Sequence, residues 1–265
     1  MRKINKIKIF GERNTGTRYL QKLIELNFNM NILSGSLDKY KFLLKILNKI
    51  KINQEFMRDI YFKYSTKKYL GWKHREVDHF EIIKKKTDLN EILFLVIVKN
   101  PYSFLLSLKE KPYHNPSYKW LGLKDLIEEF KSIDFNDFLK NEWLTVGREA
   151  DRTFYENPIQ MWNLKCASYL KLQSKYKCSL IRYEDLLDNP ELVISRISKE
   201  HKIPFNNVNF KNYNKSTKDP KKDTEFYKKK YGKELWKEKL TKEHINFINK
   251  HLDKELMETF GYKLL

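Results

Sequence analysis

A glycine-bearing turn near the N-terminus has the residue types needed to bind a phosphate-like anion. The segment Ile9-Phe-Gly11-Glu-Arg-Asn-Thr-Gly16-Thr17-Arg18 follows an alternating apolar run and precedes a helical pattern. Glycines spaced in this way let successive backbone N–H groups and the positive end of a helix dipole surround anionic oxygens. The segment therefore predicts an anion site, and an ordinary glycine-rich turn is the alternative.

The residues after the second glycine indicate which kind of anion the loop would bind. An ATP-binding loop continues with Lys and then Ser or Thr, which hold the phosphates and Mg²⁺. Here these positions are Thr17 and Arg18, so the hydroxyl for Mg²⁺ is missing and the cation has moved by one residue. This disfavours a Mg²⁺-dependent nucleotide hydrolase and favours a ligand with a 5′-phosphate and no obligatory metal. The six histidines show no metal-type spacing either.

A second cation stands at the end of the most apolar segment of the chain. Glu91-Ile-Leu-Phe-Leu-Val-Ile-Val98 is followed by Lys99-Asn-Pro-Tyr-Ser-Phe-Leu-Leu-Ser107. A lysine and a hydroxyl two helical turns further on could together hold a second phosphate. Proline at a helix start is routine, however, and Ser107 could equally be a surface residue of the helix.

These segments need a scaffold that brings strand ends together. Strands are predicted at residues 4–10, 69–73, 91–98 and 178–182, and helices at 17–27, 39–51, 77–86, 102–109, 123–131, 134–143, 158–175, 190–201 and 242–260. Alternating strands and helices predict an α/β fold, in which three layers place helices on both sides of a central parallel sheet. Such sheets bind ligands at the carboxyl ends of their strands. We expect one P-loop-like domain over residues 1–265.

Composition narrows the setting. Among 265 residues, 53 Lys and Arg stand against 34 Asp and Glu, which gives a net charge of +19 and indicates an anionic partner or compositional drift. We expect the informative share to be Arg13, Arg18, Lys73 and Lys99, each at a predicted strand end. Two cysteines cannot form a disulfide framework, and no apolar run resembles a signal peptide or a membrane span. These features favour a cytoplasmic protein.

Taken together, four segments resemble the sulfotransferase superfamily, whose donor is 3′-phosphoadenosine-5′-phosphosulfate (PAPS). Two are the loop at Gly16 and the Lys99-x-Pro segment with Ser107, although the superfamily has Arg where Lys99 stands. The others are Leu180-Ile-Arg-Tyr183-Glu-Asp-Leu and the terminal Ile248–Tyr262, which is similar to bacterial carbohydrate-type members. The resemblance covers most of the chain and rests on the order of four motifs.

The resemblance implies roles for individual residues. Lys99 and Ser107 would bind the 3′-phosphate, and Tyr183 would neighbour the adenine. Tyr19 would stack on adenine or, as an equal alternative, pack in the core. The 5′-phosphosulfate would be held by the loop residues Arg13, Asn14, Thr15, Gly16, Thr17 and Arg18.

One position departs from the family pattern. The superfamily has a lysine two residues before the loop glycine, where it stabilises the leaving group, and this chain has Asn14. Arg13 or Arg18 could supply the missing charge, and we favour Arg13. An uncharged position 14 would otherwise imply an inactive or altered enzyme.

Transfer of a sulfuryl group also needs a base for the acceptor hydroxyl. Gly71-Trp-Lys73-His74-Arg-Glu76 looks like the base-bearing segment of cytosolic-type members, with His74 as first choice and Glu76 as second. Lys73 would polarise the acceptor or the sulfuryl oxygens, and a solvated strand end is the alternative. His114 is a weaker candidate.

The sequence indicates less about the acceptor than about the donor. Aromatic and arginine residues between 111 and 157 suit a saccharide or could simply pack helices, namely Tyr113, Tyr118, Trp120, Trp143, Arg148, Arg152 and Tyr155. The basic segment 215–239 loosely matches a family loop that closes over the 3′-phosphate. A PAPS-dependent sulfotransferase acting on a carbohydrate or small metabolite is thus predicted, with no nucleic-acid partner. A P-loop nucleotide kinase and a non-catalytic polyanion or nucleic-acid binder are the alternatives.

Overall fold

The computed structural model describes residues 3–36, 57–62, 69–77, 89–112, 131–216 and 221–265. Its central sheet has four parallel strands in the order β2-β1-β3-β6. They are β1 (Lys6–Gly11), β2 (Asn31–Ile32), β3 (Ile92–Val98) and β6 (Cys178–Arg182). Every residue of β3 is buried, as its unbroken apolar sequence and its place between β1 and β6 require.

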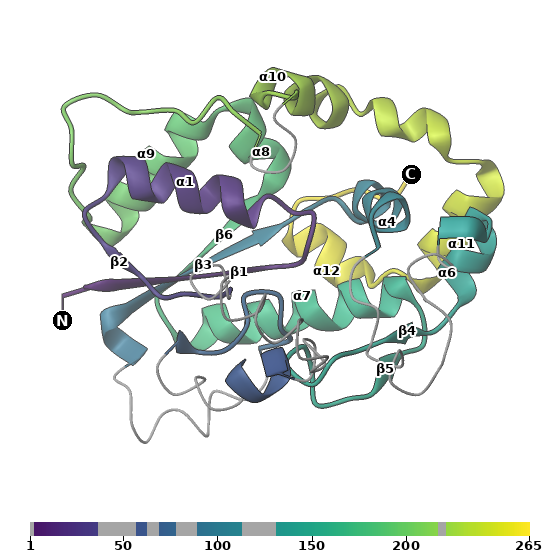
Figure 1. The fold of residues 1–265 in the computed structure, drawn as a ribbon. Helices are drawn as coiled ribbons and strands as arrows, with labels where there is room; N and C mark the ends of the chain where they lie inside the picture. The colour runs from purple at the N-terminus through teal and green to yellow at the C-terminus, as the bar shows by residue number, and fades with distance from the viewer. Residues whose placement is uncertain (1–2, 37–56, 63–68, 78–88, 113–130, 217–220) are drawn as a thin grey trace.

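Helices flank this sheet on both sides. Figure 1 shows α1 (Thr17–Asn27) and α9 (Pro190–His201) on one face and α7 (Pro158–Lys175) on the other. Both α7 and α9 begin at an Asn-Pro pair, in which the asparagine side chain caps the helix and proline takes the first helical position. The expected α/β fold, with a parallel sheet between helices, is confirmed.

The carboxyl ends of three strands meet at one edge of the sheet. The register pairs Gly11 of β1 with Ile97 of β3, and Val98 of β3 with Arg182 of β6. From these ends the chain enters α1, α4 (Pro101–Glu110) and α8 (Tyr183–Asp188). Any chemistry carried by the three strand-to-helix connections is therefore concentrated in one place.

The remaining elements lie around this frame. A separate antiparallel pair is formed by β4 (Trp143–Leu144) and β5 (Phe154–Tyr155). The other helical elements are η3 (Leu89–Glu91), α6 (Phe135–Lys140), α10 (Thr224–Tyr227), the π-helical turn η5 (Lys228–Gly232), η6 (Leu235–Lys239), α11 (Lys242–His251) and α12 (Lys254–Thr259).

Three sequence predictions are corrected. Residues 69–73 form no strand, because Leu70 and Gly71 both have left-handed backbone conformations, with φ of 59° and 76°. The predicted helix 242–260 is two helices, since Leu252 is extended and Asp253 caps α12. The predicted helix 134–143 ends at Lys140, and Trp143 belongs to β4.

Other predictions concern residues whose structure is not described. The helices expected at 39–51 and 77–86 lie almost entirely outside the described residues, and so does most of 123–131. The same holds for His114 and for the three aromatic residues Tyr113, Tyr118 and Trp120.

Candidate functional site

The turn between β1 and α1 has the geometry of an anion-binding loop. Gly16 is the N-cap residue of α1 with φ 85°, so no side chain of its own competes for the first N–H groups of the helix. A Cβ on Gly16 would come within 2.5 Å of the Tyr183 ring, and one on Gly11 within 2.4 Å of the Ile97 carbonyl oxygen. Both glycines are therefore required by close packing as well as by conformation.

Lys99 lies beside this loop as a fully buried cation. Its Nζ donates to Ser107 Oγ at 2.7 Å and sits 3.7 Å from the centre of the Tyr231 ring. The backbone carbonyl of Lys99 accepts a hydrogen bond from Trp162 of α7, which fixes the strand end. The predicted pairing of Lys99 with Ser107 is thus present as a direct hydrogen bond.

The ionisation of Lys99 and Tyr231 is linked. Burial lowers the pKa of the Lys99 ammonium, although Tyr231 and Glu184 oppose this by favouring its charged form. Burial would raise the pKa of the Tyr231 phenol, but Lys99, the Ser107 hydroxyl and Lys230 together lower it. The direct contacts of Lys99 are the Ser107 hydroxyl and the Tyr183 and Tyr231 rings, and Glu184 acts on its charge without a direct bond.

A cleft opens next to Lys99 at the carboxyl edge of the sheet. It is lined by Asn14, Gly16, Tyr19, Ser107, Glu110, Lys111, Tyr183, Leu187, Lys215, Ser216, Lys222, Thr224, Phe226, Tyr227, Lys230 and Tyr231. The empty space is about 890 Å³ and is open to solvent.

Aromatic rings form part of the cleft wall. Tyr227 stacks on Tyr231 with 4° between the ring planes, and Tyr183 meets Tyr231 edge to face. Tyr19 lines the cleft yet is buried, and its hydroxyl donates to the Asn212 side chain. Burial raises the pKa of Tyr19 to about 12. Tyr19 therefore both packs in the core and faces the cleft.

The segment after residue 70 reaches the same strand end as a loop. The Gly11 N–H donates to the Lys73 carbonyl at 3.0 Å, and the His74 ring donates from Nδ1 to the Gly11 carbonyl at 2.6 Å. Since a carbonyl can only accept, Nδ1 carries the proton and Nε2 is the basic nitrogen. Burial and the nearby charges of Lys73 and Arg13 hold the pKa of His74 well below its usual 6.5.

Glu76 is held by partners of its own. Its carboxylate accepts two hydrogen bonds from the Arg152 guanidinium, at 3.0 and 3.2 Å, and one from the Tyr155 hydroxyl at 3.0 Å. Only 5 % of Glu76 is exposed. These contacts occupy three of the roughly four lone-pair sites of the carboxylate, which leaves Glu76 little capacity to accept a proton.

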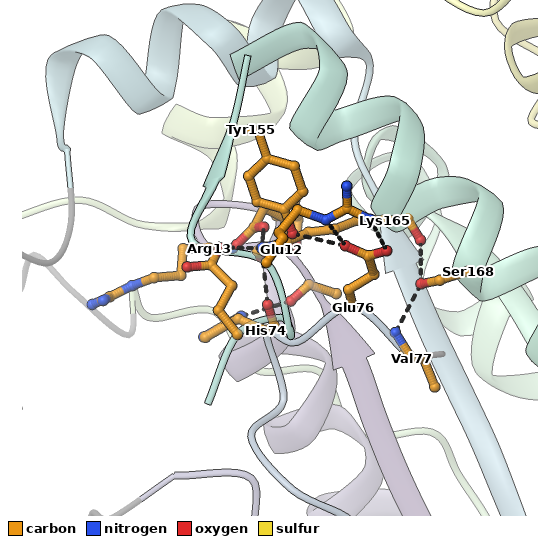
Figure 2. A network of polar contacts seen from close by, with 12 residues as sticks. Glu12, Arg13, His74, Glu76, Val77, Tyr155, Lys165 and Ser168 are labelled. Atoms are coloured by element: carbon orange, nitrogen blue, oxygen red, sulfur yellow. Dashed lines mark hydrogen bonds and ion pairs between the residues drawn. The ribbon is translucent and has the colours of Figure 1, made fainter. Parts of the chain in front are cut away.

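A buried ionic cluster connects this loop to the phosphate loop. Figure 2 shows Lys165 of α7 between Glu12 and the residues 74–77. The Lys165 Nζ donates to carboxylate oxygens of Glu12 and Glu149 and to the His74 carbonyl. The Glu12 carboxylate also accepts from the Arg13 N–H at 2.6 Å. We call Glu12, Lys165 and Glu149 the acid–lysine cluster.

The structure places the other expected residues as follows. Thr15 and Thr17 are buried in the loop, Arg13 is half-buried beside His74, and Arg18 is exposed. Asn14 faces the cleft, 3.4 Å from the Ser107 and Lys111 carbonyls. Trp143 and Tyr155 are 1 % and 0 % exposed, so they pack in the core and leave no ring face for an acceptor.

Several residues of the site were not predicted individually from the sequence. Tyr227, Tyr231 and Lys230 of the cleft belong to the basic segment that was matched only loosely. Lys165 and Ser168 were overlooked, although they fall at helical spacing between the apolar positions Met161, Trp162, Tyr169 and Leu172, a pattern that does predict burial.

The described residues include no group of three or more His, Cys, Asp or Glu side chains that could hold a metal ion. None of the described helices is long and apolar enough to cross a membrane.

Fold and site together define a parallel α/β protein with a cationic, aromatic-lined cleft at the carboxyl edge of its sheet. Neither a protein-family model nor a curated protein matches the sequence. Among solved structures, the chain is similar to a "Sulfotransferase Domain from the Curacin Biosynthetic Pathway". The match covers 100 % of both chains, with a TM-score of 0.45 and 14 % sequence identity.

Proposed function

We propose that this chain transfers the sulfuryl group of PAPS to a hydroxyl of a saccharide or small metabolite. The observation that carries the proposal is Lys99, a buried cation that is hydrogen-bonded to Ser107 and lies beside an anion-binding loop. Two separate anion subsites, one at the loop and one at Lys99, match a nucleotide with phosphates at both its 5′ and 3′ positions. The wall of the cleft adds aromatic rings for a base.

The residues of the cleft fit this donor by charge and shape. In the proposal, Lys99 and Ser107 hold the 3′-phosphate, and Lys230 of η5, which also pairs with Glu110, adds charge to the cleft. The loop from Arg13 to Arg18 surrounds the 5′-phosphosulfate with backbone N–H groups. Tyr183 and Tyr19 face the adenine.

The transfer itself needs a base and a charge for the leaving group. The acceptor oxygen forms a bond to sulfur while the bond between sulfur and the bridging phosphate oxygen breaks, and the acceptor proton passes to His74 Nε2. His74 suits this role because its lowered pKa keeps the ring unprotonated near neutral pH. Arg13, whose charge reaches His74, takes the place of the lysine absent at Asn14, and Lys73 polarises the sulfuryl oxygens.

The decisive experiment measures binding of 3′,5′-bisphosphoadenosine and of ATP, each with and without Mg²⁺, by calorimetry. We expect the bisphosphate to bind more tightly than ATP and without any need for Mg²⁺, because the loop lacks the hydroxyl that would hold the metal. Equal affinity for ATP, or an absolute requirement for Mg²⁺, would contradict a sulfotransferase and favour a kinase.

A second experiment addresses the base. Radiolabelled PAPS is offered to water and to a panel of saccharides and small hydroxylated metabolites, with the wild type and with His74→Ala. The variant should lose transfer by about 10²–10⁴-fold, which is the usual contribution of a general base. Binding of the bisphosphate should persist, and unchanged transfer would remove His74 from the mechanism. Glu76→Gln serves as the comparison variant.

A further inference from the structure

We infer that Lys165 is a positioning residue for the proposed sulfuryl transfer, holding the phosphate loop and the His74 loop in a fixed relation. The inference rests on the proposed function. Lys165 lies in the middle of α7, is 1 % exposed, and is not among the residues that line the cleft. Its effect must therefore pass through the groups to which it is bonded.

One arm of the acid–lysine cluster reaches the phosphate loop. Glu12 receives the Lys165 ammonium on one carboxylate oxygen and the Arg13 N–H, at 2.6 Å, on the other. The Glu12 carbonyl also accepts from the hydroxyl and N–H of Thr15. The loop backbone on both sides of Asn14 is thus fastened to α7 through one carboxylate residue.

The other arm reaches the His74 loop. The Lys165 Nζ donates to the His74 carbonyl at 3.0 Å, and Ser168, one turn further along α7, accepts from the Val77 N–H at 2.9 Å. Glu149, the second carboxylate partner of Lys165, accepts at its backbone carbonyl from the Glu76 N–H at 2.7 Å. The loop is therefore tied to α7 before and after Glu76 (Figure 2).

The electrostatics keep this connection intact. Burial alone would lower the pKa of Lys165, but Glu12 and Glu149 raise it above its usual 10.5. The ammonium therefore remains charged at every pH at which the enzyme would work. A charged hydrogen-bond donor at the junction of two loops is stiffer than a neutral one, since charge-assisted bonds are shorter and stronger.

The position of the cluster explains why it would matter for catalysis. In the proposal, His74 is the base and the loop after Glu12 holds the donor. The relative position of these two loops therefore sets how well the base is aligned with the reacting groups. A displacement of about 1 Å between reacting groups can slow a reaction by about a hundredfold. Gly11 already contacts Lys73 and His74 directly, and Lys165 adds a charged side chain from α7 that is bonded to both loops.

The test compares Lys165→Met with Lys171→Met, an exposed lysine on the same helix. Because removing Lys165 leaves two buried carboxylates unmatched, a charge-free variant, Glu12→Gln/Glu149→Gln/Lys165→Met, is made as well. Three quantities are measured: bisphosphate affinity, transfer from radiolabelled PAPS to water, and the shift of the His74 ring-proton resonance when the bisphosphate binds. The resonance is assigned from its absence in His74→Gln.

In the wild type and in Lys171→Met, the bisphosphate should shift the His74 resonance. In the charge-free variant we expect transfer to fall by about a hundredfold, with the dissociation constant of the bisphosphate changed by no more than about tenfold. The ligand-induced shift of the His74 resonance should disappear in the same variant. A merely structural lysine would lower the melting temperature without separating binding from turnover.

The outcomes distinguish the two proposals. A charge-free variant that folds, transfers at the wild-type rate and keeps the His74 shift overturns the role of Lys165 while leaving the proposed function intact. A wild type that binds no bisphosphate overturns the proposed function, and the inference about Lys165 with it.

Discussion

Two buried lysines in this fold have opposite surroundings. Lys99 is 0 % exposed and is bonded to a serine hydroxyl under a tyrosine ring, and its pKa is lowered. Lys165 is 1 % exposed and is bonded to two carboxylates, and its pKa is raised. The charge of Lys99 therefore has no directly bonded carboxylate, with Glu184 acting only at longer range, whereas the charge of Lys165 has two.

The difference separates a binding site from a structural support. A buried ammonium with neutral partners is destabilising until an anion arrives, because burial removes its hydration and nothing with a full charge replaces it. A buried ammonium between carboxylates already has its counterions and gains nothing from a ligand. Under the two proposals above, Lys99 is therefore a residue that binds an anion, and Lys165 is a residue that supports the loops.

The most stringent test of this difference removes the charge of each lysine in turn. Lys99→Met should weaken binding of 3′,5′-bisphosphoadenosine by about 2–5 kcal/mol, as expected for one partner of a buried charge pair. The free energy of unfolding without ligand should stay within about 1 kcal/mol of the wild type, because no buried carboxylate is left unmatched. Calorimetric titration and denaturant unfolding measure the two quantities.

Lys165→Met should show the reverse pattern, with about 3–5 kcal/mol lost from the free energy of unfolding. A control is Lys8, a third buried lysine, which donates to the carbonyls of Ser34, Tyr69 and Gly71. Lys8→Met should cost about 1–3 kcal/mol of stability, since three carbonyls lose their donor, and leave bisphosphate affinity unchanged. If Lys8→Met weakened binding as much as Lys99→Met, burial alone and not placement would be responsible.

The sequence predicts one of the two regions much better than the other. The boundaries of α1, α7, β6 and α9 agree with the predictions because local signals set them, such as the Asn-Pro pairs and the unbroken apolar runs. Lys99 and Ser107 could be paired from sequence because both lie on one strand-to-helix connection, eight residues apart. Local spacing was sufficient there.

The acid–lysine cluster depends on contacts between distant segments. Lys165 and Glu12 are separated by 153 positions, and no local pattern indicates that they meet. Tyr231 reaches Ser107 across 124 positions for the same reason. The strand predicted at residues 69–73 was wrong because Leu70 adopts a left-handed conformation, which is unusual for a leucine and is imposed by the surrounding structure.

The pH dependence of bisphosphate affinity provides a second test of the difference between the two lysines. Only the protonated form of Lys99 attracts a phosphate, and burial lowers its pKa below the usual 10.5. Bisphosphate affinity should therefore fall as pH rises through the lowered pKa of Lys99, by about tenfold per pH unit once that pKa is passed. Bound phosphate favours the charged form and raises the pKa again, so the fall begins at the lowered pKa of the free protein and ends at the higher pKa of the complex.

The matched variant for this titration is Lys99→Arg, because a guanidinium keeps its charge over the whole range. The loss of affinity at the lowered pKa of Lys99 should then disappear. A pH profile identical to that of the wild type would show that another group controls binding. Lys165 plays no part in this window, since its pKa is raised.

The smallest expected effect comes from Tyr231, an aromatic side chain in contact with the Lys99 ammonium. Tyr231 places its ring 3.7 Å from the Lys99 ammonium and its hydroxyl 3.1 Å from Ser107 Oγ. Tyr231→Phe keeps the ring and removes the hydroxyl, so it should weaken bisphosphate binding by about 0.5–1.5 kcal/mol, the usual worth of one hydrogen bond. Calorimetric titration again provides the measurement.

Tyr227→Phe is the control for that substitution, because Tyr227 stacks on Tyr231 while its hydroxyl meets Ser216 instead of Ser107. It should leave the position of the alkaline fall unchanged. Tyr231→Phe should shift that fall to lower pH, since the Tyr231 side chain favours the charged form of Lys99. A shift in the opposite direction would mean that the phenol competes with the phosphate for Lys99, and the cleft would then have to release Tyr231 before it could bind its anion.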